Sequence, residues 1–543
     1  MNRSTKLKVL SIYSEVNRQV VLEKLKAGKI TGCGPSVPTL TTKDIEATPT
    51  IVGQMGPEPY VQAMAAHPDF DIIIGGRAYD PAPYIAFCAF QAFEQSDKPV
   101  LSLPSNILGG FSHMGKIMEC GGACATPKCK GSMATVYRDG TFDIQPLAPG
   151  AVCTPTSVAA HTMYEKTRPD HLHGPGGYID LCNARYVSLS DNLSVRAQGA
   201  IFKASKELGN SYTVKLEGAK VIGYRTIFMG SFADPILISQ LSFVLEQAKK
   251  YVAQQHKLVQ EEWSLDFHVY GQHDQAESNS TGTFPSAPHE VFIVGEAVAK
   301  TQAVANAIAA TARVACVHGP YKGQKANAGN FGMGIGGRLS MEMGACAEFS
   351  LYHLMEIDEG SEEACEINTE GSGAAGEEFK NPQRYFKWDM SWLGTGERIQ
   401  RNELITRTVD QNYVPISMPI PPLRSDINGS ASPFPCTLGE VASIIRTKNA
   451  GPYEITMDVI FNNDVVYQQI KKSGILQPKL IADLYNIAEN DIIYCGFFDQ
   501  AMGFKATLPR LRNGKIAPCG GYMEDDVHGS QRHIPLFGVK LNI

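Results

Sequence analysis

The residues best suited to chemistry in this chain begin with Gly75-Gly76-Arg77-Ala78-Tyr79-Asp80-Pro81. They follow residues 71–75, whose apolar run predicts a short buried strand, and ligands in open α/β sheets bind beyond the carboxyl ends of strands. Arg77 could bind a carboxylate through two hydrogen bonds, while Asp80 could orient that arginine or act as a base. The glycines let backbone approach a ligand. An internal Arg77–Asp80 ion pair, or a helix cap at Asp80, explains the same residues equally well.

Two further segments offer polar side chains near predicted helices. Gln54 opens the run 54–59 before a helix at 60–67, where it could contact substrate, although helix capping by Glu58 explains this run about as well. Farther on, His113 and Lys116 share a face if their segment is helical, and Cys120 lies one turn beyond Lys116. We therefore expect acid–base or nucleophilic chemistry from these three, with an unreactive cysteine as the favoured interpretation of Cys120.

Metal binding is the less favoured interpretation at two places. The spacing of Cys120, Cys124 and Cys129 is similar to that of a metal cluster, but a closed zinc site or an iron–sulfur cluster needs a fourth ligand. His171 and His173 could form a triad with Asp180 if their segment is extended. A surface loop is the simpler explanation, so we expect no metal, and coenzyme A only as part of a substrate.

Glycines and cations concentrate in the loop at residues 318–338. Tyr321, Lys322, Asn327 and Asn330 lie there, before a predicted helix at 340–357. Backbone N–H groups at a helix N-terminus bind anions, which suits a phosphate, a coenzyme A pyrophosphate or a polycarboxylate. The alternative is a flexible interdomain connection. The loop is not a phosphate-binding P-loop, because Gly-Lys-Ser/Thr is absent.

The last hundred residues combine predicted regular elements with polar ends. Thr437 and Glu440 form a capping box for a helix expected over 437–446, and a strand is expected over 453–461. Lys448 and Asn449 follow that helix and, with Lys505 and Arg510 on a later strand, form a potential anion clamp. His528 and His533 could transfer protons or be solvated loop residues.

Composition describes an ordinary globular protein and excludes several classes. The chain has 543 residues, 43% of them hydrophobic, and a net charge of -6. This charge does not indicate the basic surface that nucleic-acid-binding proteins have. No apolar run is long enough to span a bilayer. Its thirteen cysteines stand mostly alone, as is typical of a reducing compartment. We expect a cytoplasmic homo-oligomer whose partners are small molecules.

The predicted helices and strands that would position these residues imply an α/β protein in two lobes with a separate small α+β domain. In the first lobe, residues 1–240, the strand at 71–75 lies between helices expected at 60–67 and 83–93, which favours a parallel sheet. An amphipathic helix is expected to end near residue 255. A second α/β lobe over 241–413 contains a strand expected at 263–270, a helix expected at 298–317, and an acidic, glycine-rich loop at 358–382. A proline-rich linker at 414–436 leads to the small domain at 437–543.

The motifs resemble those of a known family. Residues 48–59, Gly75–Pro81, 113–121, Cys153–His161 and Gly174–Gly177 together look like the acyclic terpene utilisation (AtuA-like) family, over roughly residues 8–350. Residues 437–543 resemble a small domain of unknown function that occurs beside or fused to such proteins. The resemblance implies catabolism of branched acids, often beside coenzyme A enzymes. The opening strand, 9–16, lacks the glycine-rich first loop expected in relatives, which argues against a nucleotide there.

These residues favour an enzyme of carboxylic-acid catabolism. We expect a lyase, hydratase or isomerase that acts by general acid–base chemistry on a small branched or multiply charged carboxylic acid, or on its coenzyme A thioester. Arg77 and the 318–338 loop would then face one cleft, with Lys116 or Asp80 moving the proton. The rival hypothesis is a non-catalytic subunit or scaffold that binds an acyl-coenzyme A enzyme.

Overall fold

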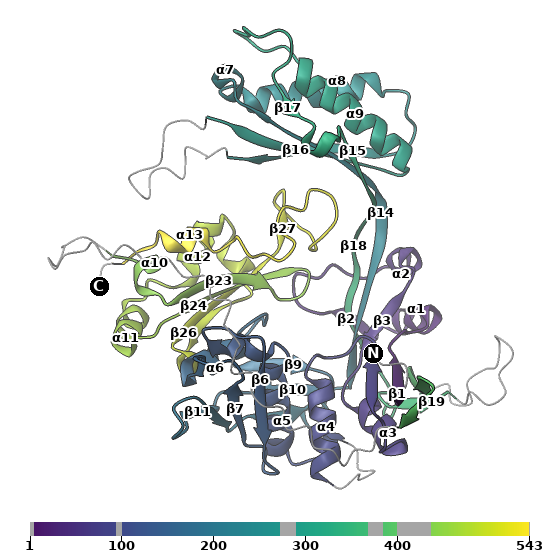
Figure 1. Ribbon diagram of the computed structural model, residues 1–543, viewed down its shortest axis with the longest axis vertical. Coiled ribbons are helices and arrows are strands. Elements are labelled where there is room, and N and C mark those ends of the chain that lie inside the picture. Colours follow the sequence, from purple (N-terminus) through teal and green to yellow (C-terminus); the bar gives the residue numbers. More distant parts are fainter. Residues whose placement is uncertain (1–4, 94–99, 272–288, 368–383, 399–435, 542–543) are drawn as a thin grey trace.

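Three bodies make up the computed structural model, which describes residues 5–93, 100–271, 289–367, 384–398 and 436–541 (Figure 1). An N-terminal body carries a distal lobe on two long strands, and a C-terminal domain lies beside both. The predicted α/β class with a separate C-terminal α+β domain is confirmed.

A mixed sheet and the helices around it form the N-terminal body. Strand β1 (Thr5–Tyr13) pairs in parallel with β4 (Ile72–Gly75) and antiparallel with β20 (Phe386–Leu393), so the predicted parallel pairing accounts for only part of the sheet. The predicted helices are present as α3 (Glu58–Ala66) and α4 (Ala82–Ala92). The other main elements of this body are α1 (Arg18–Lys26), β2 (Ile30–Gly32), α2 (Thr42–Ala47), β3 (Ile51–Gln54), α5 (Ser105–Met118), β6 (Ser132–Val136), β7 (Phe142–Pro146), α6 (Pro155–Thr162), β9 (His171–Gly174), β10 (Gly177–Asp180), β11 (Arg185–Ser188), β12 (Val195–Gln198) and β13 (Ile201–Ala204).

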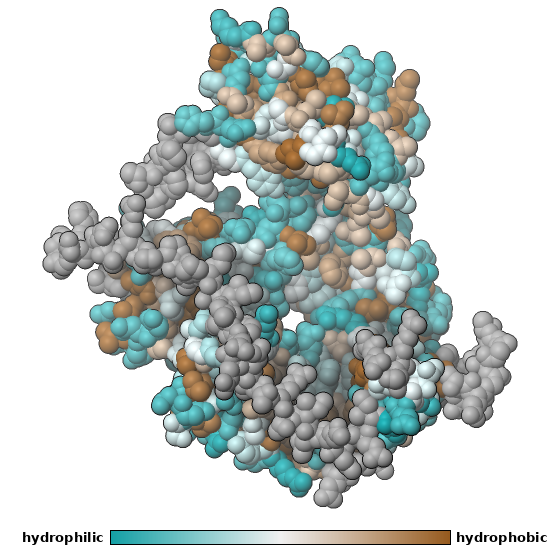
Figure 2. All heavy atoms as spheres, viewed as in Figure 1, coloured by the Kyte–Doolittle hydropathy of each residue, from teal (hydrophilic) through white to brown (hydrophobic). Residues whose placement is uncertain are grey.

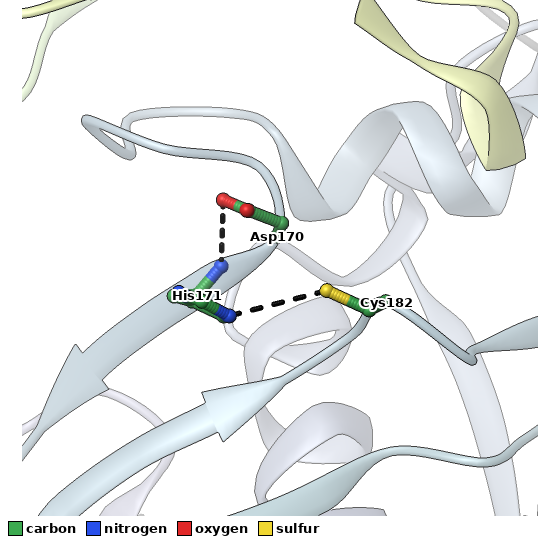
Figure 3. A group of neighbouring side chains, drawn as sticks. All are labelled: Asp170, His171 and Cys182. Carbon is green, nitrogen blue, oxygen red and sulfur yellow. Dashed lines mark hydrogen bonds between the residues drawn. The ribbon is translucent and has the colours of Figure 1, made fainter.

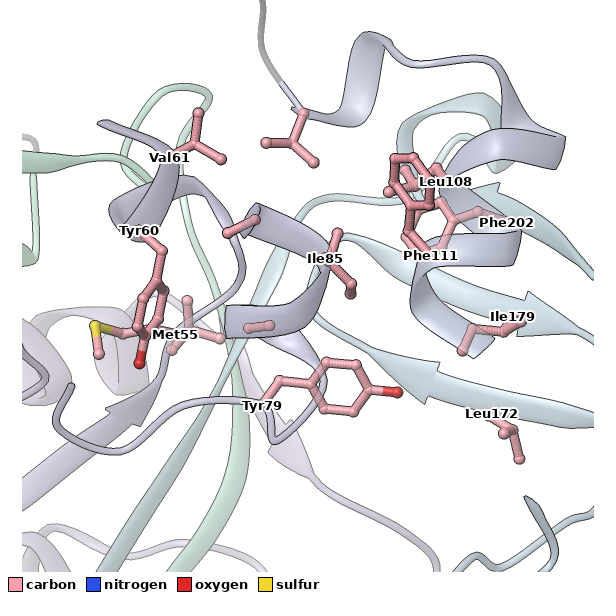
Figure 4. Close-up of a cluster of buried hydrophobic side chains, with 14 of the residues drawn as sticks. Met55, Tyr60, Val61, Tyr79, Ile85, Leu108, Phe111, Leu172, Ile179 and Phe202 are labelled. Atoms are coloured by element: carbon pink, nitrogen blue, oxygen red, sulfur yellow. The ribbon is translucent and has the colours of Figure 1, made fainter. Parts of the chain in front are cut away.

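Apolar side chains from several of these elements form one continuous core. Tyr60 of α3, Ile85 of α4 and Phe111 of α5 point into it, and the β9–β10 hairpin contributes Leu172 (Figure 4). The core fixes the start of α4 and the whole of α5 relative to the end of β4. Those three places carry most of the polar residues discussed below.

A long hairpin connects the N-terminal body to the distal lobe. Strand β14 (Thr213–Phe232) pairs antiparallel with β18 (Met341–Glu356), with three register shifts along the way. The helix predicted for 340–357 is therefore wrong. Leu351, His353 and Met355 are buried in strand alternation. Pairing with a partner more than a hundred residues earlier overrides local helix propensity here.

The distal lobe is a sheet covered by two helices. The upper part of β14 pairs with β16 (Val291–Ala299), which pairs in turn with β15 (Trp263–Tyr270), and helices α8 (Leu241–Gln255) and α9 (Gln302–His318) pack on this sheet (Figure 1). The predicted strand at 263–270 and the amphipathic helix ending near 255 are both confirmed. The helix predicted from 298 begins at Gln302, because Val298 and Ala299 complete β16.

The C-terminal domain is a four-stranded antiparallel sheet with helices on one face. Its strand order is β23 (Ile444–Asn449), β24 (Glu454–Ile460), β26 (Gly503–Pro509) and β25 (Tyr494–Phe498), and its main helices are α11 (Asp464–Ser473) and α12 (Pro478–Tyr485). The predicted capping box is present, but the helix that it begins, α10 (Leu438–Val441), lasts one turn. The predicted helix 437–446 is thus wrong beyond residue 441, since 444–449 pair with β24.

The surface alternates hydrophilic and hydrophobic residues, and hydrophilic ones gather around the hollow between the C-terminal domain and the long hairpin (Figure 2). Within the part of the chain that the structure describes, no helix combines the length and the apolar character needed to cross a membrane.

Candidate functional site

The two glycines after β4 are required by packing. A Cβ on Gly75 would overlap the hydroxyl group of Tyr60, and a Cβ on Gly76 would lie 2.6 Å from Oγ of Ser14. The main chain therefore passes between two side chains of its own core before it reaches Arg77. This explains the glycines without a ligand, in contrast to the sequence-based interpretation.

Arg77 is held by a carboxylate that the sequence did not reveal. Its Nε donates to Glu217 Oε2 at 2.5 Å and its Nη2 donates to Glu217 Oε1 at 3.0 Å, while Asp80 lies 3.5 Å from Nη1. Lys215 also pairs with Glu217, at 2.8 Å, and lies opposite Gln54 of β3. Both donors of a bidentate contact are thus occupied within the protein, and Nη1 makes longer contacts of 3.5 Å with the Ala78 carbonyl and with Asp80.

A cavity of about 640 Å³ opens in front of Arg77. Polar groups are contributed to the lining by Arg77, Tyr79, Asp80 and Glu119. Most of the other lining side chains are apolar or aromatic: Tyr60, Met64, Phe70, Ile73, Pro83, Tyr84 and Phe87. A lining of both kinds suits a ligand that has a branched hydrocarbon part and a charged or polar head.

A buried ion pair lies beside the cavity, and its carboxylate residue, Glu119, lines the wall. Lys116, 1% exposed near the end of α5, donates to Oε1 of Glu119, and Oε2 of Glu119 is buried without a hydrogen-bond partner in the described residues. Burial and the nearby ammonium group of Lys166 hold the pKa of Lys116 below its usual value. A proton shared by such a pair can move at modest cost, which is what general acid–base catalysis needs.

Two more buried polar atoms near this pair lack partners among the described residues. The hydroxyl group of Tyr79 is one, and burial together with Glu119 raises its pKa well above the ordinary value. Nε2 of His161 is the other; burial and the charge of Lys116 lower its pKa to about 3, so the ring is neutral at pH 7. Buried polar groups are normally hydrogen-bonded. Glu119 Oε2, the Tyr79 hydroxyl and His161 Nε2 are three atoms near Lys116 without a hydrogen-bond partner in the described residues, and together they indicate a binding site for a ligand or water.

Lys166 supplies a cation without a carboxylate partner in the described part of the chain. Its Nζ lies 5.3 Å from the ring centre of Tyr79, and burial lowers its pKa. Sequence reasoning missed it, because residues 164–168 carry no motif. The nearest signal was the cluster of charges directly after the predicted Cys153–His161 motif.

The other candidates on α5 are less well placed for catalysis. His113 is fully buried against Phe142 and Tyr186, its Nε2 shares a hydrogen bond of 3.1 Å with the Tyr186 hydroxyl, and burial lowers its pKa to about 3. Cys120 is exposed, but partial burial of its thiol and the charge of Glu119 raise its pKa, which disfavours the nucleophilic thiolate.

The glycine-rich loop 318–338 belongs to the distal lobe. Tyr321 is buried in that lobe's core and donates to Asp234 at 2.5 Å, the main-chain oxygen of Lys322 accepts from Gln240, and Asn330 donates to Ala326 of its own loop. Asn327 is exposed. Because a strand follows the loop, the helix dipole proposed for anion binding is missing.

Arg77 and this loop meet β14 at opposite ends. Arg77 binds Glu217, whereas Gly332 and Met333 pair with Ser231 and Gly230. Thirteen residues of strand (230 − 217) span roughly 40 Å at about 3.3 Å per residue. The expectation of one shared cleft is therefore wrong.

The C-terminal residues proposed as an anion clamp are bound to protein groups. Lys448 lies 3.5 Å from Glu165, and Asn449 donates to the Val527 carbonyl while it accepts from Arg510. Lys505 is buried against Asp458. Through Glu165, Lys448 nevertheless contacts the segment that carries Lys166.

One group of side chains in the described residues could hold a metal ion. The ligand atoms of Asp170, His171 and Cys182 lie within 4.8 Å of one another (Figure 3). However, both carboxylate oxygens of Asp170 accept hydrogen bonds from Arg168, at 3.0 and 2.8 Å, and that positive charge opposes a cation. His171 and His173 lie in strand β9, so the surface loop favoured from the sequence is wrong at these residues, and the extended segment that a triad would require is present.

Two family models match regions of this chain. Residues 7–332 match the model of the acyclic terpene utilisation family protein AtuA. The chain belongs to the acyclic terpene utilisation family. Membership suggests a role in acyclic terpene utilisation, and Arg77, Lys116 and Lys166 all lie within the family region. Residues 438–540 match a domain of unknown function, DUF4387. No curated protein and no solved structure matches the chain.

Proposed function

We propose that this protein is an enzyme of carboxylic-acid catabolism that moves a proton on a branched carboxylic acid or on its coenzyme A thioester, as a lyase, hydratase or isomerase. The single observation that supports this most is the buried Lys116–Glu119 pair, whose second carboxylate oxygen has no hydrogen-bond partner in the described residues and whose Glu119 lines the cavity. Structural ion pairs rarely leave such an acceptor unsatisfied.

Each side chain has a role that its surroundings suit. Glu119 would take a proton from the carbon next to the substrate carboxyl group: the C–H bond breaks, an O–H bond forms on Glu119, and the electron pair moves toward the carbonyl. Before the proton transfer, the ammonium group of Lys116 would stabilise the ionised carboxylate of Glu119. After the transfer, the same ammonium group would offset the negative charge that has moved to the substrate. The buried hydroxyl of Tyr79 could donate a hydrogen bond to the oxygen on which charge develops.

Substrate recognition would divide between the charged and the apolar lining of the cavity. Lys166 is the cation best placed to bind a carboxylate, because no acidic side chain among the described residues forms an ion pair with it, and Arg77 could add a donor through Nη1. The apolar wall would bury the branched hydrocarbon part of the substrate, and each Å² of apolar surface buried would stabilise the complex by about 25 cal/mol. The family's association with acyclic terpenes agrees with such a substrate.

Deuterium exchange can test the chemistry without knowledge of the final product. Branched acids and thioesters that stabilise the purified protein in a thermal-shift screen would be incubated with it in D2O, and incorporation beside the carboxyl group would be followed by NMR. Glu119→Gln should slow exchange at least about a hundredfold, as expected for loss of a general base. The control is Glu359→Gln, at an exposed surface ion pair with Lys206.

Two outcomes would contradict the proposal. Equal exchange rates in Glu119→Gln and Glu359→Gln would remove Glu119 from the chemistry. Binding without exchange or turnover, with activity only after a second protein is added, would favour the rival function of a scaffold for an acyl-coenzyme A enzyme.

A further inference from the structure

The sheet of the C-terminal domain has two buried faces of opposite character. Along β24, Ile455, Met457 and Val459 alternate with Glu454, Thr456 and Asp458, and all six are buried. The first set contributes to the apolar side of the strand; Met457 and Val459 belong to the domain's core. A polar face that is buried must find hydrogen-bond partners, since burial without them is costly.

The partners belong to the N-terminal body, in the segment 160–167. Arg446 donates to the Ala160 carbonyl at 2.8 Å, Lys505 to the Met163 carbonyl at 2.8 Å, and Thr507 to the Thr167 carbonyl at 2.7 Å. In return, the Thr167 hydroxyl donates to Glu454 at 2.6 Å. Three main-chain carbonyls within eight residues are therefore bound by side chains of another domain.

Charge complementarity strengthens this contact. Arg446, Asp458 and Lys505 lie opposite one another on three neighbouring strands, so one carboxylate stands between two cations. The excess positive charge faces the C-terminal end of α6 and the turn after it. There the Ala160 carbonyl accepts from the Met163 amide at 3.3 Å and, in addition, from Arg446 at 2.8 Å. Cations near a helix C-terminus are favourable because the helix dipole places partial negative charge on its last carbonyls.

We propose that the C-terminal domain is a positioning element of the site: the polar face of its sheet holds segment 160–167 in the conformation that presents Lys166 to Tyr79 and Lys116. The proposal rests on the proposed function only in that Lys166 would be the cation that binds substrate. Thr507 and Lys505 are positioning residues in this scheme, because they act through the segment and do not contact the cavity.

The matched test uses two threonines of the same sheet in the full-length protein. Thr507→Val removes the hydroxyl that binds the Thr167 carbonyl and keeps the side-chain shape. Thr447→Val is the control, since the buried hydroxyl of Thr447 has no hydrogen-bond partner among the described residues. Thr507→Ser restores a hydroxyl and should restore the wild-type behaviour.

Two measurements report on the segment and need no substrate. Amide hydrogen exchange over 163–168 should become roughly tenfold faster in Thr507→Val, as expected when one hydrogen bond to a buried group is lost. Acetylation of Lys166 by acetic anhydride, followed by mass spectrometry against pH, should show its midpoint moving upward toward the ordinary lysine value of about 10.4, because a loosened segment lets water reach the ammonium group.

The two proposals can fail separately. If Thr507→Val matches Thr447→Val in both measurements, the positioning role is overturned. If Thr507→Val shifts the acetylation profile of Lys166 but Lys166→Met binds acids as the wild type does, the positioning role stands and the proposed substrate contact fails. If Thr507→Val does not fold, Arg446→Gln replaces it, because that side chain is 20% exposed and its loss leaves the Lys505–Asp458 pair.

Discussion

The distal loop 318–338 and the central segment 160–168 both carry cations, yet folding treats them in opposite ways. The loop has Lys322, Lys325 and Arg338, which stay in solvent, and its glycines serve turns with positive φ. The segment has two cations, Lys166 and Arg168, and Lys166 is enclosed with Lys116 and with polar atoms that lack partners in the described residues. Glycines and cations in a sequence therefore indicate a site only where the fold also withdraws them from water.

The physical reason for the difference is solvation. A charge in water interacts weakly with a ligand, because water screens it and must be displaced on binding. A charge enclosed by protein has already lost most of its water, so a ligand that supplies the missing partner gains more. Four predictions test this contrast, from the largest expected effect to the smallest.

Replacing one carboxylate in the part of the protein that supports each region should separate them most clearly: Asp458 lies in the sheet that binds the segment, and Asp266 lies in the lobe that carries the loop. Asp458→Asn leaves Lys505, which is 0% exposed, beside Arg446, and we expect a loss of about 3 kcal/mol or more in the free energy of unfolding. Asp266→Asn in the distal lobe breaks a pair with Lys249 that is 32% and 37% exposed, and should cost under about 1 kcal/mol. Urea unfolding of both variants at pH 7 is the measurement. Similar losses would contradict the contrast.

Glu58 extends the contrast to a buried carboxylate outside both regions. Burial raises its pKa to about 7, and Oε1 has no hydrogen-bond partner in the described residues. Because the folded pKa exceeds the ordinary value, this group's contribution to stability is complete below about pH 4.5 and is lost as the pH rises through 7.

Glu58→Gln should abolish that loss, which we expect to be about 2–3 kcal/mol. Unfolding free energies of the wild type and the variant, measured at pH 5 and pH 8, test it. An unchanged difference between the two pH values in the variant would show that Glu58 is not the titrating group.

The same contrast predicts that one lysine substitution lowers ligand affinity and that another leaves it unchanged. Lys166→Met should weaken binding of a branched carboxylic acid roughly ten- to a hundredfold, the loss of one charge-assisted hydrogen bond. Lys322→Met removes an exposed charge of the distal loop and should leave affinity unchanged. Isothermal titration calorimetry with the acid selected by the thermal-shift screen decides. Weaker binding by Lys322→Met would show that the loop 318–338 belongs to the binding site.

The smallest effect is expected at Tyr321, which the sequence suggested as a substrate contact. Tyr321→Phe removes a hydrogen bond to Asp234 and should cost about 1 kcal/mol in stability of the distal lobe. Ligand affinity should not change. Hydrogen exchange measures the stability of the distal lobe, and calorimetry measures ligand affinity. A loss of affinity in Tyr321→Phe would contradict our assignment of Tyr321 to the core.

Elements were predictable from the sequence wherever their pattern is local. The strand at 263–270, the helix at 83–93 and the capping box at Thr437 follow from periodicity and from contacts three or four residues apart. The segments 340–357 and 444–446 were mistaken for helix, because their strand conformation depends on partners elsewhere in the chain. Short apolar runs do not distinguish the two states.

The sequence by itself determined the local elements, the family and the residue types from which the proposed site is built, including Arg77, Lys116 and Asp80. Only the tertiary structure decided which charges are paired and which are enclosed without a partner among the described residues. Arg77 meets Glu217 across 140 residues, and Arg446 meets the Ala160 carbonyl across 286. Burial and electrostatic pairing depend on distances in space, and a sequence pattern reports only distances along the chain.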